Sequence, residues 1–251
     1  MTYRVITQAD EPGIDERIEG TEGLWPRYNT EGDVLGKYWF RLYEVFPDFQ
    51  FVLFDEDAGK PIAEGHCLPI TWDGTVGGLP QGIDAAVLTG FELAESGGMP
   101  DTICALAIEV PPAVGRRGVS REMIRAMASL AVKAGLDRFI APVRPSFKER
   151  YPLVPIEEYA AWRREDGLHF DPWVRTHERL GAKILKPAPE SLRVTGAVAE
   201  WEEWVEMEFP RSGMYVIPRG LATVEIDRDA DRGSYWEPNI WMSHPVPGDT
   251  P

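Results

Sequence analysis

The sequence predicts an α/β protein in which a sheet is flanked by helices. The main observation is the order of patterns over residues 102–143: an apolar run, a glycine-containing loop, an amphipathic stretch and a second apolar run. A hairpin pattern at residues 49–70 and several short strand patterns in the last third of the chain are two further observations. Strand, helix and strand in succession form the basic unit of folds that cover a sheet with helices.

The N-terminal part predicts a strand at residues 3–7 and a helix at residues 34–46, where apolar and polar residues alternate with helical spacing. Residues 49–54 are rich in aromatic and β-branched side chains, which favour a strand. The polar turn at residues 55–60 connects this strand to the apolar run at residues 62–70, so the two runs predict a hairpin.

The central unit begins with residues 102–110, which are apolar almost without interruption, as in a strand covered on both faces. Two prolines then end its pairing. After Gly118, apolar residues recur every three or four positions, and Gly135 is a natural C-terminal stop for the helix that this spacing predicts. Residues 138–143 read as the next buried strand.

The loop at residues 115–120, Gly-Arg-Arg-Gly-Val-Ser, opens directly into this helix. The first N–H groups of a helix have no intrahelical acceptor and lie at its positive end, so we expect a phosphate there. Arg121 adds to the local positive charge, and Arg144 and Lys148 are candidates for a further phosphate or are solvated. Spacing alone leaves open an ordinary crossover whose arginine pair is solvated surface.

A long connection at residues 146–173 leads to the next helix, with a short helix expected at residues 156–164. Asp171 is placed to be an N-cap, with Pro172 at the first helical position. Trp173 and His177 are four residues apart and should lie one above the other, which indicates a partly apolar pocket around the imidazole.

The C-terminal third predicts strands at residues 183–185, 192–198, 203–209, 214–217 and 221–226. The aromatic cluster at residues 235–241 should not remain exposed. It plugs the sheet, covers a binding site or meets another subunit, and a homodimer is among the arrangements left open.

Composition excludes several classes of protein. A formal net charge of -15 argues against nucleic acid as a partner. No run is apolar enough to span a membrane and the N-terminus lacks the pattern of a signal peptide, so we expect a cytoplasmic protein without a membrane partner. Cys67 and Cys104 read as small buried residues, and no spacing of metal-ligating residues is recognisable, so we expect no metal.

The loop at residues 115–120 resembles motif A of the GNAT superfamily of acyl-CoA-dependent N-acyltransferases, Gln/Arg-x-x-Gly-x-Gly/Ala before a helix. Gly118 matches the central glycine and Arg117 the arginine before it. Gly115 and Ser120 depart from the pattern. A second segment, residues 175–182, resembles the superfamily's Tyr-Glu-x-Leu-Gly-Phe turn, with His177 in the position of the tyrosine. The resemblance covers about residues 35–210.

The resemblance implies a mixed, largely antiparallel twisted sheet flanked by helices, in one domain over residues 1–251 with a C-terminal extension at 211–251 that adds strands. It also implies an enzyme that moves an acetyl or other acyl group from acyl-CoA to the amine of a small acceptor, by direct attack in a ternary complex. The residues that it places on the acyl-CoA are Ile108, Val110, Arg116, Arg117, Gly118, Val119, Ser120 and Arg121.

Such a reaction needs a base for the amine and a proton for the departing thiolate. Glu109, at the end of the first strand of the unit, is the candidate base or water-orienting carboxylate, and the alternative is a surface or salt-bridged glutamate. His177 is the candidate proton donor to sulfur, because an unperturbed imidazole titrates near 6.5; the alternative is a structural histidine.

The expected acceptor pocket includes His169, Asp171 and Trp173, with residues 74–100 and 146–173 as its variable walls. Two other functions stay open at this point. One is acyl transfer from an acyl carrier protein thioester through the same groove. The other is a non-catalytic acyl-CoA-binding or regulatory protein, which the altered loop and the missing tyrosine would fit.

Overall fold

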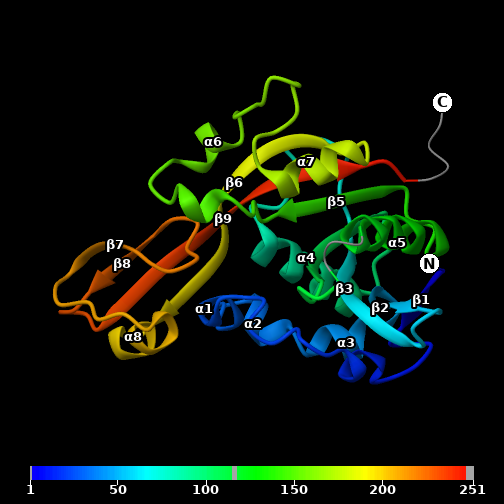
Figure 1. Ribbon diagram of the computed structural model, residues 1–251, viewed down its shortest axis with the longest axis horizontal. Coiled ribbons are helices and arrows are strands. Elements are labelled where there is room, and N and C mark those ends of the chain that lie inside the picture. Colours follow the sequence, from blue (N-terminus) through cyan, green and yellow to red (C-terminus); the bar gives the residue numbers. More distant parts are fainter. Residues whose placement is uncertain (1, 115–117, 247–251) are drawn as a thin grey trace.

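The computed structural model describes residues 2–114 and 118–246. Its strands form one twisted sheet, nine-stranded over these residues (Figure 1). Along the sheet the order is β1 (Tyr3–Thr7), β2 (Gln50–Asp55), β3 (Lys60–Ile70), β4 (Thr102–Glu109), β5 (Arg138–Val143), β9 (Arg232–His244), β8 (Thr223–Asp227) and β7 (Gly213–Val216), and β6 (Lys183–Gly196) also pairs with β9. The pair β4–β5 is parallel and the other described pairs are antiparallel. The expected mixed, largely antiparallel sheet is confirmed.

Helices cover both faces of the sheet, because neighbouring residues of each central strand point to opposite sides. In β4, Cys104 packs into one core and Ile103 into the other. The first core contains α1 (Arg27–Thr30), α2 (Leu35–Tyr38), α3 (Arg41–Val45), α4 (Ile83–Ser96) and α8 (Val198–Val205). The second contains α5 (Val119–Lys133), α6 (Ile156–Tyr159) and α7 (Pro172–Arg179). Short 3-10 turns occur at Ile14–Arg17, Pro47–Phe49 and Lys148–Arg150.

The predicted strand, loop, helix and strand unit is confirmed as β4, α5 and β5. The α5 residues Met123, Met127 and Ala131 are buried against the sheet, as the three-and-four spacing requires. Gly118 at its N-cap has φ 76° and Gly135 beyond its C-cap has φ 69°, and only glycine adopts such angles readily. Arg116 and Arg117 lie outside the described residues.

The two strands of this unit separate soon after they begin to pair. Their register runs from Thr102 opposite Arg138 to Cys104 opposite Ile140 and includes no later pair. Both strands continue beyond this point, β4 to Glu109 and β5 to Val143. The divergence opens a gap in the sheet between strands that are otherwise buried, and this gap positions the site.

Four local predictions were wrong. Residues 203–209 do not form a strand: the chain is helical in α8, where Val198, Trp201 and Val205 are buried at intervals of three and four residues. The helix expected at residues 34–46 is divided into the short α2 and α3, and the one at 156–164 ends at Tyr159. The two strands expected at 183–185 and 192–198 are parts of the one long strand β6, which pairs with β9 through two bulges.

The C-terminal segment is part of the same sheet, to which it adds β7, β8 and β9. The aromatic cluster at residues 235–241 lies in β9, between β5 and β6, and the whole strand runs beside β6 for most of its length (Figure 1). Of the three arrangements that the sequence leaves open, the cluster therefore adopts the one in which it plugs the sheet. β1 forms the edge of the sheet opposite to β7.

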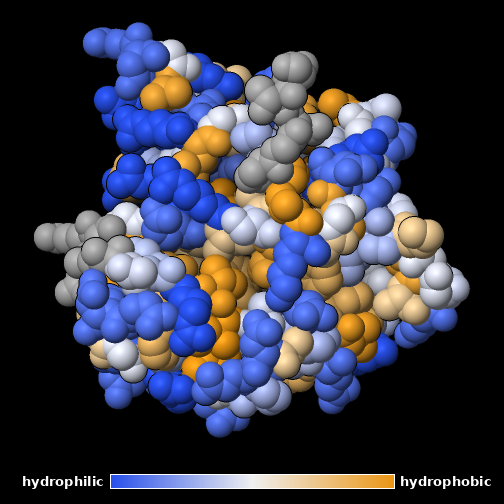
Figure 2. All heavy atoms as spheres, turned by 90° about the vertical axis from the view of Figure 1, so that its right-hand side faces the viewer, coloured by the Kyte–Doolittle hydropathy of each residue, from blue (hydrophilic) through white to orange (hydrophobic). Residues whose placement is uncertain are grey.

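Hydrophilic side chains predominate around the outline of the face shown in Figure 2, and hydrophobic ones gather toward its middle. Within the described ranges, no helix combines the length and apolar character that crossing a bilayer requires. Cys67 and Cys104 are buried free thiols, as predicted.

Candidate active site

A cavity of about 440 Å³ occupies the gap between the diverging strands. Its walls include residues 105–109 from β4 and residues 141–144 at the end of β5. Glu237 and Asn239 of β9 and Trp173 and His177 of α7 contribute on one side, and Trp25, Asn29 and Trp39 from the N-terminal part contribute on the other. The predicted catalytic pair, Glu109 and His177, is therefore brought to one cavity.

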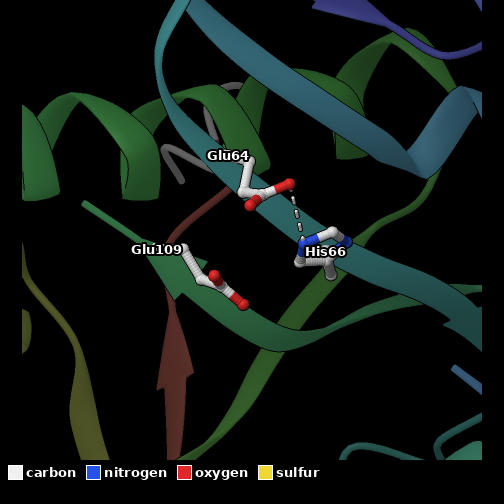
Figure 3. A group of neighbouring side chains, drawn as sticks. All are labelled: Glu64, His66 and Glu109. Atoms are coloured by element: carbon white, nitrogen blue, oxygen red, sulfur yellow. Dashed lines mark ion pairs between the residues drawn. The ribbon is translucent and has the colours of Figure 1, made fainter. Parts of the chain in front are cut away.

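Glu109 belongs to a group of titratable side chains on adjacent strands (Figure 3). Glu64 and His66 alternate along β3, and Glu64 is the direct partner of Glu109 across the β3–β4 pair, so all three point to the same side. One ligand atom from each lies within 4.8 Å of the others. The carboxylate of Glu109 also accepts a hydrogen bond of 2.8 Å from the indole N–H of Trp25.

The surroundings make Glu109 a better base than an exposed glutamate. Burial raises its pKa above the ordinary value, and the neighbouring Glu64 carboxylate raises it further, whereas His66 and the Trp25 N–H act in the opposite direction. A carboxylate with a raised pKa accepts a proton more readily near neutral pH. The prediction that Glu109 is the base stays a prediction, and its position and electrostatics are suited to it.

His66 is held in one orientation. Its Nδ1 lies 3.2 Å from Oε1 of Gln50, whose amide N–H groups donate to the Phe46 and Cys67 carbonyls. With its oxygen thus fixed, Gln50 accepts from Nδ1–H, and Nε2 of His66 faces Glu64 at 3.6 Å. The imidazole also packs on Trp39 at 4.5 Å between ring centroids.

Sequence spacing gave no sign of a metal site, yet Glu64, His66 and Glu109 together meet the distance requirement for one. Their grouping depends on the register between two strands and was missed for that reason. The alternation of Glu64 and His66 at i and i+2, combined with the predicted hairpin, was the available signal.

His177 does not have the environment that its predicted role assumed. Its ring is 4% exposed, and its Nδ1 lies 2.8 Å from Nε2 of His244 on β9. Burial, and secondarily the neighbouring His244, hold the pKa of His177 well below its ordinary 6.5. The argument that this imidazole titrates near 6.5 was therefore wrong, and the ring is neutral at neutral pH. Trp173 packs edge-on at 4.4 Å, as the spacing predicted.

Two of the three residues predicted for the acceptor pocket do not line the cavity. Asp171 is fully buried, and its carboxylate caps α7 by accepting from the N–H groups of Trp173 and Val174. The same carboxylate accepts hydrogen bonds from the Phe147 N–H and the Tyr159 hydroxyl. His169 is fully buried and accepts from the Asp171 N–H. Only Trp173 reaches the cavity. The N-cap prediction for Asp171 is confirmed and leaves its carboxylate no capacity for substrate.

Arg144 and Lys148, candidates for a second phosphate, are committed to other contacts. Arg144 is paired with the buried carboxylate of Glu237, which also accepts from Asn29 Nδ2 at 3.0 Å and from the Tyr235 hydroxyl. Lys148 is 1% exposed and donates to the carbonyls of Tyr151 and Leu221. Lys148 is therefore not solvated, whereas Arg144 keeps 17% of its side chain exposed and lines the cavity. Their contact with a phosphate stays a prediction.

The start of α5 has the geometry expected for anion binding. Gly118 and Ser120 are partly exposed, and Arg121 is exposed one position further on. The N–H groups of Val119 and Ser120 precede the first intrahelical bonds, which run from Arg121 and Glu122 back to Gly118. Ile108 lines the cavity, whereas Val110 and residues 118–121 lie outside its walls.

Comparison with known proteins found no matching family model. A curated relative, the arginine N-acetyltransferase avaD of Aspergillus versicolor, is 29% identical over 275 aligned residues, which cover 97% of this chain and 94% of avaD. The chain also matches the loading GNATL domain of CurA from Lyngbya majuscula, with 18% identity, TM-score 0.55 and 98% of each chain covered.

The GphF GNAT-like decarboxylase, solved with isobutyryl-CoA, gives 14% identity and TM-score 0.52 over 98% of this chain and 100% of GphF. These two structures share the fold. The chain therefore has the fold of these GNAT proteins, and its sequence is similar to that of an N-acetyltransferase over nearly its whole length.

Proposed function

We propose that this protein transfers an acetyl group from acetyl-CoA to a nitrogen atom of arginine or a close cationic analogue. The main support for the proposal is the carboxylate pair Glu64 and Glu109, of which Glu109 lines the cavity between the diverging strands. The relative avaD is named for arginine, which is a cation of this kind.

The acyl donor fits the same gap. In the proposed complex, pantetheine lies along residues 105–109 of β4, where the early end of the β4–β5 pairing frees backbone groups for a ligand. The diphosphate then reaches the N–H groups at the start of α5, where Gly118 allows close approach and Arg121 adds positive charge.

The acceptor enters from the side of Trp25 and Trp39. A guanidinium or ammonium group is attracted to the two carboxylates and by the faces of the indole rings. Glu109 takes a proton from the nitrogen, which attacks the thioester carbon in a ternary complex. The C–S bond then breaks, an amide C–N bond remains, and the thiolate takes up a proton.

The two other functions left open by the sequence are not favoured. A carrier-protein donor would require a docking surface for a protein, and no described feature points to one. A non-catalytic sensor would not need a carboxylate with a raised pKa at the cavity.

The test is free-thiol release from acetyl-CoA with arginine, agmatine, lysine and citrulline as acceptors. Citrulline matches arginine in shape but carries a neutral urea group, so it is the matched control for charge. We expect release with arginine and at least about a tenfold lower kcat/KM with citrulline, since loss of one charge-assisted hydrogen bond is worth that much. Absence of release with every cationic acceptor would refute the proposal.

A further inference from the structure

His177 contacts a second buried histidine, His244, to which the proposed acyl transfer gives no role. The two rings come from α7 and from the last described strand, β9, and their facing nitrogens are 2.8 Å apart. His177 is 4% exposed and His244 is 7% exposed. A hydrogen bond of this length between two imidazoles requires one N–H donor and one lone pair, so the pair has two possible arrangements of its hydrogens.

The outer nitrogen of His177 is the second observation. Its Nε2 is buried without a hydrogen-bond partner among the described residues, although the ring lines the cavity. A buried polar atom left without a partner costs free energy, so such atoms are normally paired. A substrate group that forms a hydrogen bond with Nε2 would remove this cost. A substrate bound in the cavity brings such a group to the place of the proposed acyl transfer.

The packing around the rings keeps both of them neutral. Trp173 contacts His177 edge-on, and Phe139 stacks on His244 at 4.5 Å with an interplanar angle of 21°. Both neighbours are uncharged. Burial lowers the pKa of His244 to about 4 and that of His177 well below 6.5, and the neighbouring His244 lowers the pKa of His177 further. An ordinary histidine acid, which donates from an imidazolium, does not fit this environment.

We propose that His177 and His244 form a neutral two-imidazole relay, in which His244 is a positioning residue that replaces the proton His177 gives to the leaving sulfur. The proposal rests on the acyl transfer proposed above. A proton passes through the pair while neither ring becomes charged, which resolves the conflict between the buried position of His177 and the need to protonate a thiolate.

His177 begins with its hydrogen on Nε2, and His244 donates from Nε2 to Nδ1 of His177. The Nε2–H bond of His177 breaks as the S–H bond forms, the proton of His244 crosses to Nδ1 of His177, and Nδ1 of His244 takes a proton from hydronium. The pair returns after product release, when Nε2 of His177 takes a proton from solvent that enters the cavity and Nδ1 of His244 releases one to solvent, while the acceptor's proton leaves through Glu109.

The kinetic test uses His244→Gln, whose amide N–H can still donate to Nδ1 of His177 but cannot pass a proton on. We expect thiol release in single turnover to fall by about tenfold to a hundredfold, within the range of proton-transfer catalysis, with the KM for acetyl-CoA little changed. In mixtures of light and heavy water, the rate of the wild-type protein should vary with curvature, because several protons move, and that of the variant should vary linearly.

Phe139→Leu is the matched control, because it loosens the packing on His244 and leaves both imidazoles in place. It should keep the curvature. Loss of curvature in Phe139→Leu, or an unchanged rate and curvature in His244→Gln, would overturn the relay and leave the proposed function standing. Absence of thiol release by the wild-type protein would instead refute the proposed function.

A second measurement needs no turnover and no variant. Nitrogen-15 spectra of the histidine rings in the wild-type protein at pH 7 should show two neutral imidazoles and a coupling across the His177–His244 hydrogen bond. An imidazolium in either ring, or rings without this coupling, would overturn the proposal even if the His244→Gln variant failed to fold.

Discussion

Glu64 and Glu109 are direct partners in the β3–β4 pair, so two carboxylates share one side of the sheet beside the cavity that Glu109 lines. Like charges at this distance make it costly for both groups to be ionised. Burial raises the pKa of Glu109 most, and the cross-strand register adds the effect of the Glu64 charge, whereas His66 and the Trp25 N–H oppose both.

Replacing Glu64 should shift the pH dependence of the reaction. Glu109 acts as a base only when ionised, and removal of the Glu64 charge lowers its pKa. In Glu64→Gln, the acidic limb of kcat/KM should therefore move to lower pH. Glu56→Gln, an exposed change directly after β2, is the control and should leave the limb in place. An unmoved limb in Glu64→Gln would show that the Glu64 charge does not govern the base.

Replacing Glu109 itself should separate activity from stability. Glu109→Gln should lower kcat by about 10²- to 10⁴-fold, because it removes the base and keeps the shape. The folded-state pKa of Glu109 is raised, so its ionised form costs stability as pH rises through that pKa. At pH 7 the variant should thus melt at a temperature no lower than the wild-type protein. A lower melting temperature together with full activity would contradict both assignments.

The histidine pair should make the protein sensitive to acid. His244 titrates at about 4 when folded and at 6.5 in its ordinary state, so the unfolded chain binds the extra proton between these values. Stability is complete above pH 6.5 and is lost as pH falls toward 4, by an amount of order 3 kcal/mol from this ring. Urea unfolding from pH 4 to 7 measures it. His244→Gln should flatten this dependence, and an unchanged slope would exclude His244 as its source.

The two ends of α5 allow strain and ligand binding to be told apart. Gly118→Ala and Gly135→Ala each place a side chain at positive φ, so each should cost about 1 kcal/mol of stability. Only Gly118→Ala should also weaken CoA binding, measured by calorimetry, because it changes the loop that faces the proposed diphosphate. Equal effects of the two variants on CoA affinity would argue against that placement.

The buried carboxylate of Glu237 should be structurally indispensable. Glu237→Ala leaves Arg144 without its partner in a largely buried position and leaves the donors Asn29 and Tyr235 unmatched, so we expect a loss of about 3 kcal/mol or more in the free energy of unfolding. The exposed pair Arg4–Glu56 is the comparison, and Glu56→Ala should cost less than about 1 kcal/mol. Similar losses in both variants would refute the network's special role.

The local sequence pattern was sufficient to predict elements that have one buried face and one exposed face. The α5 helix, its limiting glycines and the N-cap Asp171 follow from side-chain spacing and backbone chemistry within a few residues. The same kind of evidence failed at α8. Trp204 and the acidic residues around it alternate with a period of two, which predicted a strand, whereas Val198, Trp201 and Val205 follow the spacing of a helix. Helix and strand patterns are hard to distinguish over such short segments.

The sequence by itself determined the order of the elements, the strand, loop, helix and strand unit, and the choice of Glu109 and His177. Only the tertiary structure decided what those two residues can do, because their partners Glu64, His66 and His244 come from other strands through pairing register. Charge and proton affinity depend on distance and burial in three dimensions, and a linear pattern contains neither. Hence Glu109 kept its predicted place, whereas His177 proved to be a neutral ring beside a second one.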